Sequence, residues 1–322
     1  MKYTKIVGTG RYLPKKILTN FDLEKMVDTN DEWIRTRTGV ERRHCVAPDQ
    51  TTSDMCVEAA KVAIEDAGIL PTDIDMVVVG TTSPDLIFPN AATLVQHRLG
   101  IPACPCIATE EACTSFIYGL SIADKFVKTG EAKCILVIGA ECITKLVDWS
   151  DRNTCVLFGD GAGAVIVKSS DEPGIIATHL GADGQYKDLL YYPVGASKDL
   201  HEAGTDEASI IMRGNEVFKV AVKTLGNVAT EVLEKAGVSQ DELDWLIPHQ
   251  ANLRIIQATA KRLDLPMEKV IITVQDHGNT SAASVPMALD VGIRDGRVKK
   301  GQMVLMEAFG GGFTWGSVLM RL

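Results

Sequence analysis

The sequence lacks the features of a membrane or exported protein. No apolar run approaches the length that a helix needs to cross a bilayer, and residues 1–8 begin a strand without the apolar core of a signal peptide. The eight cysteines follow no framework of even spacings, which is typical of a reducing compartment. We therefore expect a cytoplasmic protein that does not bind membranes.

Complete motifs for metals and nucleotides are also lacking. The cysteines at 104 and 106 are too close for the usual zinc pair and have no second pair, so no metal site is expected. Gly8-Thr9-Gly10 lacks the third glycine of a dinucleotide loop, because Leu13 stands in its place. The glycine-rich run 159–163 lacks the Lys-Ser/Thr ending of a phosphate loop and leads into a strand at 164–167, which favours close backbone packing.

Positive charge is scarcer than negative charge. The chain has 33 Lys and Arg against 42 Asp and Glu, a net charge of -9, which argues against general nucleic-acid binding. A length of 322 residues, with 46% hydrophobic and 23% charged residues, is typical of a soluble globular protein with two domains or one large one.

The sequence contains an internal repeat. Residues 67–79 resemble 236–247 at an offset of 169, 99–102 resemble 263–266 at 164, and Cys113-Thr114-Ser115 matches Asn279-Thr280-Ser281 at 166. Each half alternates strands and helices, so we predict two duplicated α/β halves around mostly parallel sheets. The predicted domains are 1–172 and 173–322, with a polar link at 169–174 and a surface excursion at 183–209.

Cys113 lies where a predicted strand turns into a helix. Apolar residues from Phe116 to Val127 recur at helical spacing, Thr129-Gly130 ends the helix, and 104–108 read as a short buried strand. The free N–H groups of a helix N-terminus lower the pKa of a nearby thiol, which makes Cys113 a candidate nucleophile. The alternative is a buried structural cysteine.

Two residues of the second half are candidates for the same site. The repeat places Asn279 at the helix N-terminus equivalent to that of Cys113. His249 follows the predicted strand 245–248, at the carboxyl end where α/β sheets bind ligands. If the halves are related by a pseudo-twofold axis, the three side chains converge on one cavity.

These residue types suit acyl transfer. A thiolate takes an acyl group from a thioester, and the backbone N–H of Cys113 with that of the Gly310–Gly312 run can stabilise the tetrahedral oxyanion. His249 and Asn279 can donate hydrogen bonds to an enolate that forms by loss of carbon dioxide. Separately, Trp33 and its basic neighbours in 30–39 are either a solvated face or a site for a flat, phosphate-bearing ligand.

Several motifs in order resemble those of the β-ketoacyl-[acyl-carrier-protein] synthase III family, which initiates type II fatty-acid synthesis. They are residues 28–34, 158–163, 247–252, 277–284 and 308–312. The resemblance implies the thiolase fold, an α/β fold with α-β-α-β-α layers, a homodimer, and a Cys113-His249-Asn279 site with Cys113 and Gly311 as the oxyanion hole. It implies an acyltransferase that moves an acyl group, from acetyl-coenzyme A or another acyl-coenzyme A, to Cys113 and condenses it with malonyl-acyl-carrier protein. The coenzyme A thioester is then a substrate, and no cofactor is tightly bound.

The same resemblance assigns further positions. Those that match coenzyme A contacts are Thr29, Trp33, Arg37, Arg152, Gly214, Phe218 and Ala251, with Trp33 and Arg152 flanking the adenine. Phe88 matches a residue lent to the neighbouring subunit's acyl pocket. Arg254, Lys261 and Arg262 match the basic helix face that receives the acidic carrier protein.

The positions of the cysteines distinguish the chain from degradative thiolases. Those enzymes need a second Cys in the C-terminal half, whereas all cysteines here lie at or before Cys155.

Three residues around the nucleophile depart from the family pattern. Glu110, Glu111 and Ser115 stand where the family usually has small residues and Gly. We expect both Glu side chains to point away from the sulfur. The alternatives are a condensing enzyme of secondary metabolism with another donor, or a thiolase-fold scaffold that these residues have silenced.

Overall fold

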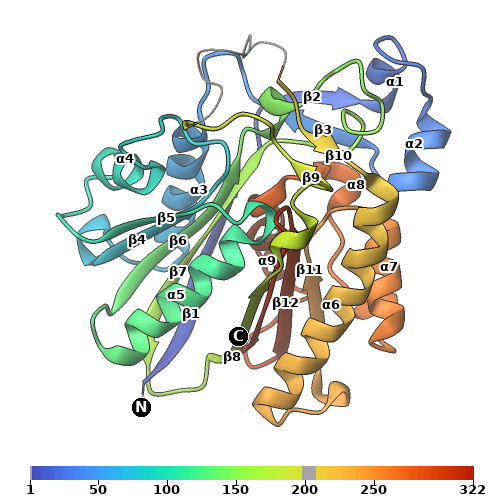
Figure 1. The fold of residues 1–322 in the computed structure, drawn as a ribbon. Helices are drawn as coiled ribbons and strands as arrows, with labels where there is room; N and C mark the ends of the chain where they lie inside the picture. Colours follow the sequence, from blue (N-terminus) through green and yellow to red (C-terminus); the bar gives the residue numbers. More distant parts are fainter. Residues whose placement is uncertain (1, 198–207) are drawn as a thin grey trace.

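Two large β-sheets with a pair of helices between them form the frame of the protein (Figure 1). The structure is a computed structural model that describes residues 2–197 and 208–322. Residues 198–207, part of the predicted surface excursion at 183–209, lie outside the described residues. No helix among the described residues is both long and apolar enough to cross a bilayer.

The first sheet has five strands in the order β1-β7-β6-β4-β5, and the second has four in the order β11-β12-β13-β8. Their bounds are β1 Tyr3–Tyr12, β4 Met76–Gly80, β5 Cys106–Thr109, β6 Cys134–Glu141 and β7 Gly161–Ser170, then β8 Ile175–Ala182, β11 Trp245–Pro248, β12 Met303–Gly310 and β13 Thr314–Arg321. Only the β4–β5, β4–β6 and β11–β12 pairs are parallel. The prediction of mostly parallel sheets was therefore wrong, because tight returns such as that between β12 and β13 make neighbours antiparallel.

Helices cover both faces of each sheet. Helix α3 (Thr52–Asp66) and α4 (Ala91–Arg98) pack on the outer face of the first sheet, and α6 (Gly214–Ala236) and α7 (Leu253–Arg262) on that of the second. Between the sheets lie α5 (Ser115–Thr129) and α9 (Ser284–Arg294), as Figure 1 shows. The order of layers is α-β-α-β-α, which confirms the predicted fold class.

Strand β4 illustrates why these segments are apolar throughout. Val77 and Val79 belong to the core under α3, whereas Met76 and Val78 face the two central helices. Side chains alternate between the faces of a strand, and here both faces are covered by helices. The whole of β4 is buried, so a continuous apolar run is what the fold requires.

The remaining elements are short and connect the layers. They are β2 Lys16–Thr19, α1 Asn20–Leu23, α2 Asp31–Thr38, β3 Arg42–Cys45, β9 Leu190–Tyr191, β10 Ile211–Met212 and α8 Val274–His277, with the 3₁₀ turns η1 Pro71–Asp73, η2 Ala112–Thr114, η3 Ile143–Leu146, η4 Gly184–Tyr186, η6 Gln240–Glu242, η7 Met267–Lys269 and η8 Ser281–Ala283. The prediction of a short buried strand at 104–108 was wrong in its start and in its burial. Strand β5 begins at Cys106 and lies at the sheet edge, where residues 106–108 are only partly buried.

The repeat is visible in where the elements begin. The pairs β4 and β11, η2 and η8, α5 and α9, and β6 and β12 each begin 169 residues apart (245 minus 76, 281 minus 112, 284 minus 115, 303 minus 134). By this register Cys113 corresponds to Ala282. The predicted equivalence of Cys113 and Asn279 was wrong, because the sequence match aligned Thr-Ser pairs whose backbones are not equivalent. The chain passes from the first sheet to the second between Ser170 of β7 and Ile175 of β8.

Candidate active site

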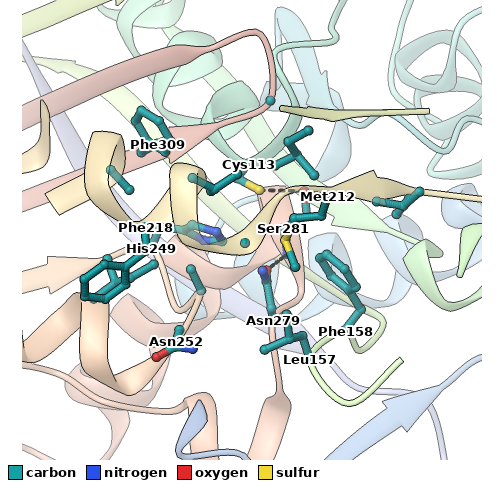
Figure 2. Close-up of a pocket in the computed structure, with 18 of the residues that line it drawn as sticks. Cys113, Leu157, Phe158, Met212, Phe218, His249, Asn252, Asn279, Ser281 and Phe309 are labelled. Atoms are coloured by element: carbon teal, nitrogen blue, oxygen red, sulfur yellow. Dashed lines mark hydrogen bonds between the residues drawn. The ribbon is translucent and has the colours of Figure 1, made fainter. Parts of the chain in front are cut away.

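A cavity of about 490 Å³ opens where the two sheets end around η2 and η8. Cys113, His249 and Asn279 all line it, and Figure 2 shows their side chains gathered around one space. Much of the remaining wall is apolar and includes Leu146, Val156, Phe158, Leu190, Met212 and Phe309. The structure thus brings together three polar groups from distant parts of the chain at one end of an apolar channel.

Cys113 lies in the strained turn η2. The preceding residue, Ala112, has φ 48°, a left-handed conformation that non-glycine residues rarely adopt. Thr114 fixes the turn, since its backbone N–H and hydroxyl both donate to the Glu111 carbonyl, at 3.0 and 2.6 Å. The thiol therefore has a defined position before α5, with a residue exposure of 8%.

The thiol is not activated in the way that the sequence led us to expect. The pKa of Cys113 is raised to about 12, chiefly by burial. A hydrogen bond from Ser281 lowers the pKa, and the charge of Glu141 raises it. The expectation of a lowered pKa was wrong. Cys113 is out of water, and this burial is the largest cause of the raised pKa. The turn η2 that carries Cys113 leads directly into α5 at Ser115.

The two unusual glutamates, Glu110 and Glu111, are not among the groups that shift the pKa of the Cys113 thiol. Glu110 is exposed and Glu111 is partly buried, and burial raises the pKa of the Glu111 carboxyl. Neither contributes to the raised pKa of the Cys113 thiol, for which the charge that acts is that of Glu141. The charge of Glu111 instead affects Tyr118 of α5. The pKa of Tyr118 is raised chiefly by burial and to a smaller extent by this charge. The expectation that both side chains point away from the sulfur stays a prediction.

Ser115, the third departure, is accommodated by a glycine on β4. A Cβ atom added to Gly80 would lie 2.7 Å from the Ser115 Cβ and 2.8 Å from its backbone carbon. Real Cβ atoms do not come so close, so the absence of a side chain at Gly80 makes room for the one at Ser115. The first turn of α5 can therefore pack against the first sheet.

His249 directly follows β11, as predicted, and its ring is oriented by a serine of the central helix α9. The ring atom Nδ1 lies 2.6 Å from the Ser284 hydroxyl, which also accepts the backbone N–H of Gln250 at 3.3 Å. In the tautomer in which the Ser284 hydroxyl donates to Nδ1, Nε2 carries the N–H and is the donor. Burial lowers the pKa of His249 to about 3, so the imidazole is neutral.

Asn279 is held by backbone on both sides. Its N–H donates to the Leu157 carbonyl at 2.8 Å, and its carbonyl accepts the Gly159 N–H at 3.0 Å, as in a short parallel bridge. The side-chain Oδ1 accepts the Ser281 N–H at 2.9 Å, which leaves the Nδ2 amide group as a donor (Figure 2). Gly278 is required at φ 67°, where a Cβ would lie 2.9 Å from the Leu157 carbonyl oxygen.

The glycine run after β12 approaches the nucleophile closely. A Cβ on Gly310 would lie 2.8 Å from the Cys113 backbone nitrogen, so this glycine permits η2 to rest on β12. Gly311 lines the cavity, as does Cys113. The glycine-rich run at 159–163 also serves packing, as predicted, because a Cβ on Gly163 would lie 2.7 Å from the Met287 nitrogen.

Residues that match coenzyme A contacts gather at the same cavity. Trp33, Arg37, Gly214, Phe218 and Ala251 line it. The guanidinium carbons of Arg37 and Arg152 lie 4.8 and 5.1 Å from the Trp33 ring centroid, within the range of a cation–π contact. Thr29, just before α2, has a buried hydroxyl without a hydrogen-bond partner among the described residues.

The other predicted binding residues lie on the surface. Phe88 is 83% exposed, beside the exposed Leu86 and Ile87, in the loop between β4 and α4. Arg254, Lys261 and Arg262 are all exposed on α7. Arg254 also lines the cavity and lies over the Phe218 ring, and Arg262 donates to Asn227 of α6 at 2.7 Å. Within residues 2–197 and 208–322, no group of three or more acidic, His or Cys side chains is arranged to hold a metal.

Sequence reasoning missed three residues of this site. Ser281 and Ser284 follow Asn279 closely in the sequence, and they contact Asn279 and His249, respectively. Glu141 is the last residue of β6 and accepts a hydrogen bond from the Ser281 hydroxyl at 3.3 Å. The signal for Ser281 and Ser284 was their proximity to Asn279 in the sequence. Glu141 carried a different signal, since a carboxylate directly after an apolar strand is an unusual buried charge.

Comparison with known proteins identifies the family. The profile described as "3-Oxoacyl-[acyl-carrier-protein (ACP)] synthase III" matches residues 108–184, and its C-terminal counterpart matches 233–322. A beta-ketoacyl-[acyl-carrier-protein] synthase III of Xanthomonas campestris is 59% identical over 319 residues, which is 99% of this chain and 98% of the relative. The chain belongs to the β-ketoacyl-[acyl-carrier-protein] synthase III family. The recognition from sequence motifs is thereby confirmed.

Solved structures of this family share the fold along the whole chain. The 3-oxoacyl-[acyl-carrier-protein] synthase III of Aquifex aeolicus is 49% identical, with a TM-score of 0.93 over 99% of this chain and all of the other. The priming β-ketosynthase of the R1128 polyketide pathway is 36% identical, with a TM-score of 0.94 over all of this chain and 96% of the other. The fold is therefore shared by enzymes of fatty-acid synthesis and by one that primes a polyketide.

Proposed function

We propose that Cys113, His249 and Asn279 carry out the condensation of an acyl-coenzyme A with malonyl-acyl-carrier protein. As a member of its family the chain is a condensing acyltransferase that initiates fatty-acid synthesis. The observation that carries the residue assignment is the meeting of a thiol, a neutral imidazole and an oriented amide in one cavity. No resident cofactor is required for this chemistry, because the thioester substrate is itself activated.

In the first half-reaction the Cys113 sulfur attacks the thioester carbonyl of the acyl-coenzyme A. A carbon–sulfur bond forms to Cys113, the bond to the coenzyme A sulfur breaks, and coenzyme A leaves as a thiol with the proton that Cys113 gives up. The backbone N–H groups of Cys113 and Gly311 are proposed to bind the tetrahedral oxyanion.

In the second half-reaction malonyl-acyl-carrier protein replaces coenzyme A. Its carboxylate leaves as carbon dioxide, and the electron pair of the broken bond becomes an enolate on the thioester. His249 Nε2 and Asn279 Nδ2 donate to that oxygen. Both are available as donors, because the Ser284 hydroxyl is bonded to His249 Nδ1 and the Ser281 N–H to Asn279 Oδ1. The enolate carbon then attacks the acyl carbonyl carbon, and the bond from that carbon to Cys113 Sγ breaks. The sulfur leaves as a thiolate, which takes up a proton from water.

Coenzyme A is proposed to lie along Trp33, Arg37 and Arg152, with Thr29, Gly214, Phe218 and Ala251 beside the pantetheine arm. Support comes from the cavity wall and from the two guanidinium groups on the Trp33 ring. The adenine is proposed to be flanked by Trp33 and Arg152. Basic residues here suit the phosphates of coenzyme A.

We further propose a homodimer in which Phe88 enters the partner's acyl pocket. An 83% exposed Phe beside two further exposed apolar side chains supports an interface at this loop. The halves 1–172 and 173–322 remain the proposed domains. A second candidate donor class, that of a priming synthase in secondary metabolism, is favoured by the similarity to the R1128 enzyme. Initial rates with acyl-coenzyme A of increasing chain length distinguish the two donors.

The test of the assignment separates the two half-reactions in a Cys113→Ala variant. This variant should accept no acyl group from acetyl-coenzyme A, yet it should still release carbon dioxide from malonyl-acyl-carrier protein, because His249 and Asn279 are intact. Acyl transfer and carbon dioxide release are measured separately with labelled substrates. Normal condensation by this variant would overturn the role of Cys113.

A further inference from the structure

Arg43 of β3 carries a guanidinium group that is fully buried. Its hydrogen-bond partners among the described residues are carbonyl and amide oxygens. Nη2 donates to Asn20 Oδ1 at 2.9 Å and to the Val156 carbonyl at 2.8 Å, and Nη1 donates to the Leu18 carbonyl at 3.2 Å. Burial lowers the pKa of Arg43 to about 10, so the group keeps its charge at neutral pH. Hydrogen bonds from a charged donor are stronger than neutral ones, so Arg43 holds these three acceptors firmly.

The Val156 carbonyl begins the segment on which the backbone of Asn279 rests. The next carbonyl, that of Leu157, accepts the Asn279 N–H at 2.8 Å, and the Gly159 N–H donates to the Asn279 carbonyl at 3.0 Å. Figure 2 shows Leu157 next to Asn279 at the cavity. Arg43 therefore fixes the residue directly before this bridge.

The stem of Arg43 packs under both sides of the same bridge. A Cβ atom added to Gly159 would lie 3.0 Å from the Arg43 Cβ, and one added to Gly278 would lie 3.2 Å from it. At these distances a side chain on either glycine would press against Arg43. Both backbone segments of the bridge therefore rest on Arg43, while the Asn279 side chain lines the cavity.

Asn20 fixes the orientation of the guanidinium relative to α2. Its Nδ2 amide donates to Asp31 Oδ1 at 2.9 Å and to the Val40 carbonyl at 2.8 Å, which leaves Oδ1 as the acceptor for Arg43. Asp31 is the first residue of α2, the helix that carries Trp33. A continuous set of hydrogen bonds thus joins α2 to the segment that holds Asn279.

We propose that Arg43 is a positioning residue for the second half-reaction, because it holds residues 156–159, and through them the Asn279 amide, where the enolate forms. Arg43 itself is fully buried and is not among the described residues that line the cavity. A misplacement of about 1 Å at a reacting centre can reduce the rate about a hundredfold. Acylation of Cys113 uses groups of η2 and the Gly311 backbone, so it should not depend on Arg43. The inference rests on the proposed role of Asn279.

The experiment compares the two half-reactions in Arg43→Lys. This change keeps the positive charge, but a single ammonium group cannot reproduce the fork that contacts Val156 and Asn20. The kcat for carbon dioxide release from malonyl-acyl-carrier protein should fall about ten- to a hundredfold, with little change in KM. The rate of acylation by acetyl-coenzyme A should stay as in the wild-type protein. Both steps are measured with labelled substrates.

A second variant covers the case in which Arg43→Lys does not fold. Asn20→Ala leaves the guanidinium and its bond to Val156 in place and removes only the group that orients it. It should produce a smaller loss in carbon dioxide release and none in acylation. Cys45→Ala is the matched control, since Cys45 is a buried residue of the same strand that is not among those lining the cavity. It should leave both half-reactions unchanged.

A double variant tests whether the effect passes through the amide. Arg43→Lys/Asn279→Ala should release carbon dioxide no more slowly than Asn279→Ala alone, because the group that Arg43 positions is already gone. Losses that multiply in the double variant, or equal losses in both half-reactions of Arg43→Lys, would overturn the proposal. A loss in Asn279→Ala without one in Arg43→Lys would overturn it and leave the proposed function standing. No loss in Asn279→Ala would overturn both.

Discussion

The turns η2 and η8 have the same backbone and different tasks. Each begins with a residue at φ 48°, Ala112 in one and Ser281 in the other, and each leads into a helix that lies between the sheets. Each turn packs against a strand of the other half: η2 against β12 of the second sheet, and η8 against β6 of the first sheet. A Cβ on Gly310 of the second sheet would lie 2.8 Å from the Cys113 nitrogen, and one on Gly139 of the first sheet 2.1 Å from the Ala282 carbonyl oxygen.

The difference lies in which side chain each turn presents to the cavity. In η2 it is the Cys113 thiol. In η8 the residue at the position of Cys113 is Ala282, which has no reactive group, and the polar groups come from Ser281 and, before the turn, Asn279. In the proposed mechanism, the duplicated backbone provides a nucleophile on one side and hydrogen-bond donors on the other. If this division holds, damage to either turn should impair a different half-reaction.

The largest expected effect comes from removing the amide before η8. Asn279→Ala should reduce condensation by about two to three powers of ten, because one of two donors to the enolate is lost. Acylation of Cys113 should remain, since that step uses groups of η2 and of the Gly311 backbone. Acyl-enzyme formation and carbon dioxide release are measured in parallel. Condensation at the wild-type rate would refute the assignment of Asn279.

A second prediction concerns the packing that supports η2. Gly80→Ala should lower the free energy of unfolding by about 1–3 kcal/mol, because its new Cβ would overlap Ser115. The double variant Gly80→Ala/Ser115→Gly should be less destabilised than the sum of the single changes, by about 1 kcal/mol. Denaturant unfolding of the four proteins measures this coupling. Strict additivity would mean that Ser115 and Gly80 do not accommodate each other.

The smallest effect is expected outside both turns, on α7. Lys261→Glu should raise the KM for malonyl-acyl-carrier protein by about three- to tenfold, because an exposed cation is replaced by an anion that repels an acidic partner. Lys261 is preferable to Arg254, which lines the cavity and lies over Phe218. Acylation by acetyl-coenzyme A serves as the control. An equal loss in both steps would indicate a general defect and no docking role.

Much of this arrangement could be predicted from sequence. Apolar periodicity located α5 and its end at Gly130, and the match of 67–79 with 236–247 predicted two related α/β halves. The position of His249 after β11 followed from the same reasoning. These features depend on local patterns, which a chain carries whatever its tertiary contacts are.

Features that depend on backbone conformation or on long-range contacts could not be predicted. The match of Cys113 to Asn279 relied on neighbouring Thr and Ser, whereas the equivalent backbones are set by the left-handed residues Ala112 and Ser281. The raised pKa of the thiol depends chiefly on burial and also on the charge of Glu141, a residue distant from Cys113 in the sequence. The Ser281 hydroxyl contacts both residues. Neither a conformation with positive φ nor a buried charge has a reliable sequence signal.

The central claim is that η2 carries the nucleophile, and the acylation of Cys113 tests it most directly. The protein is mixed with acetyl-coenzyme A, without malonyl-acyl-carrier protein, and its intact mass and the mass of the Cys113 peptide are measured. We predict one acetyl group per chain, on Cys113, in the wild-type protein and in Asn279→Ala, and none in Cys113→Ala. An unmodified Cys113 peptide, or acetylation of another residue that supports condensation, would contradict the account.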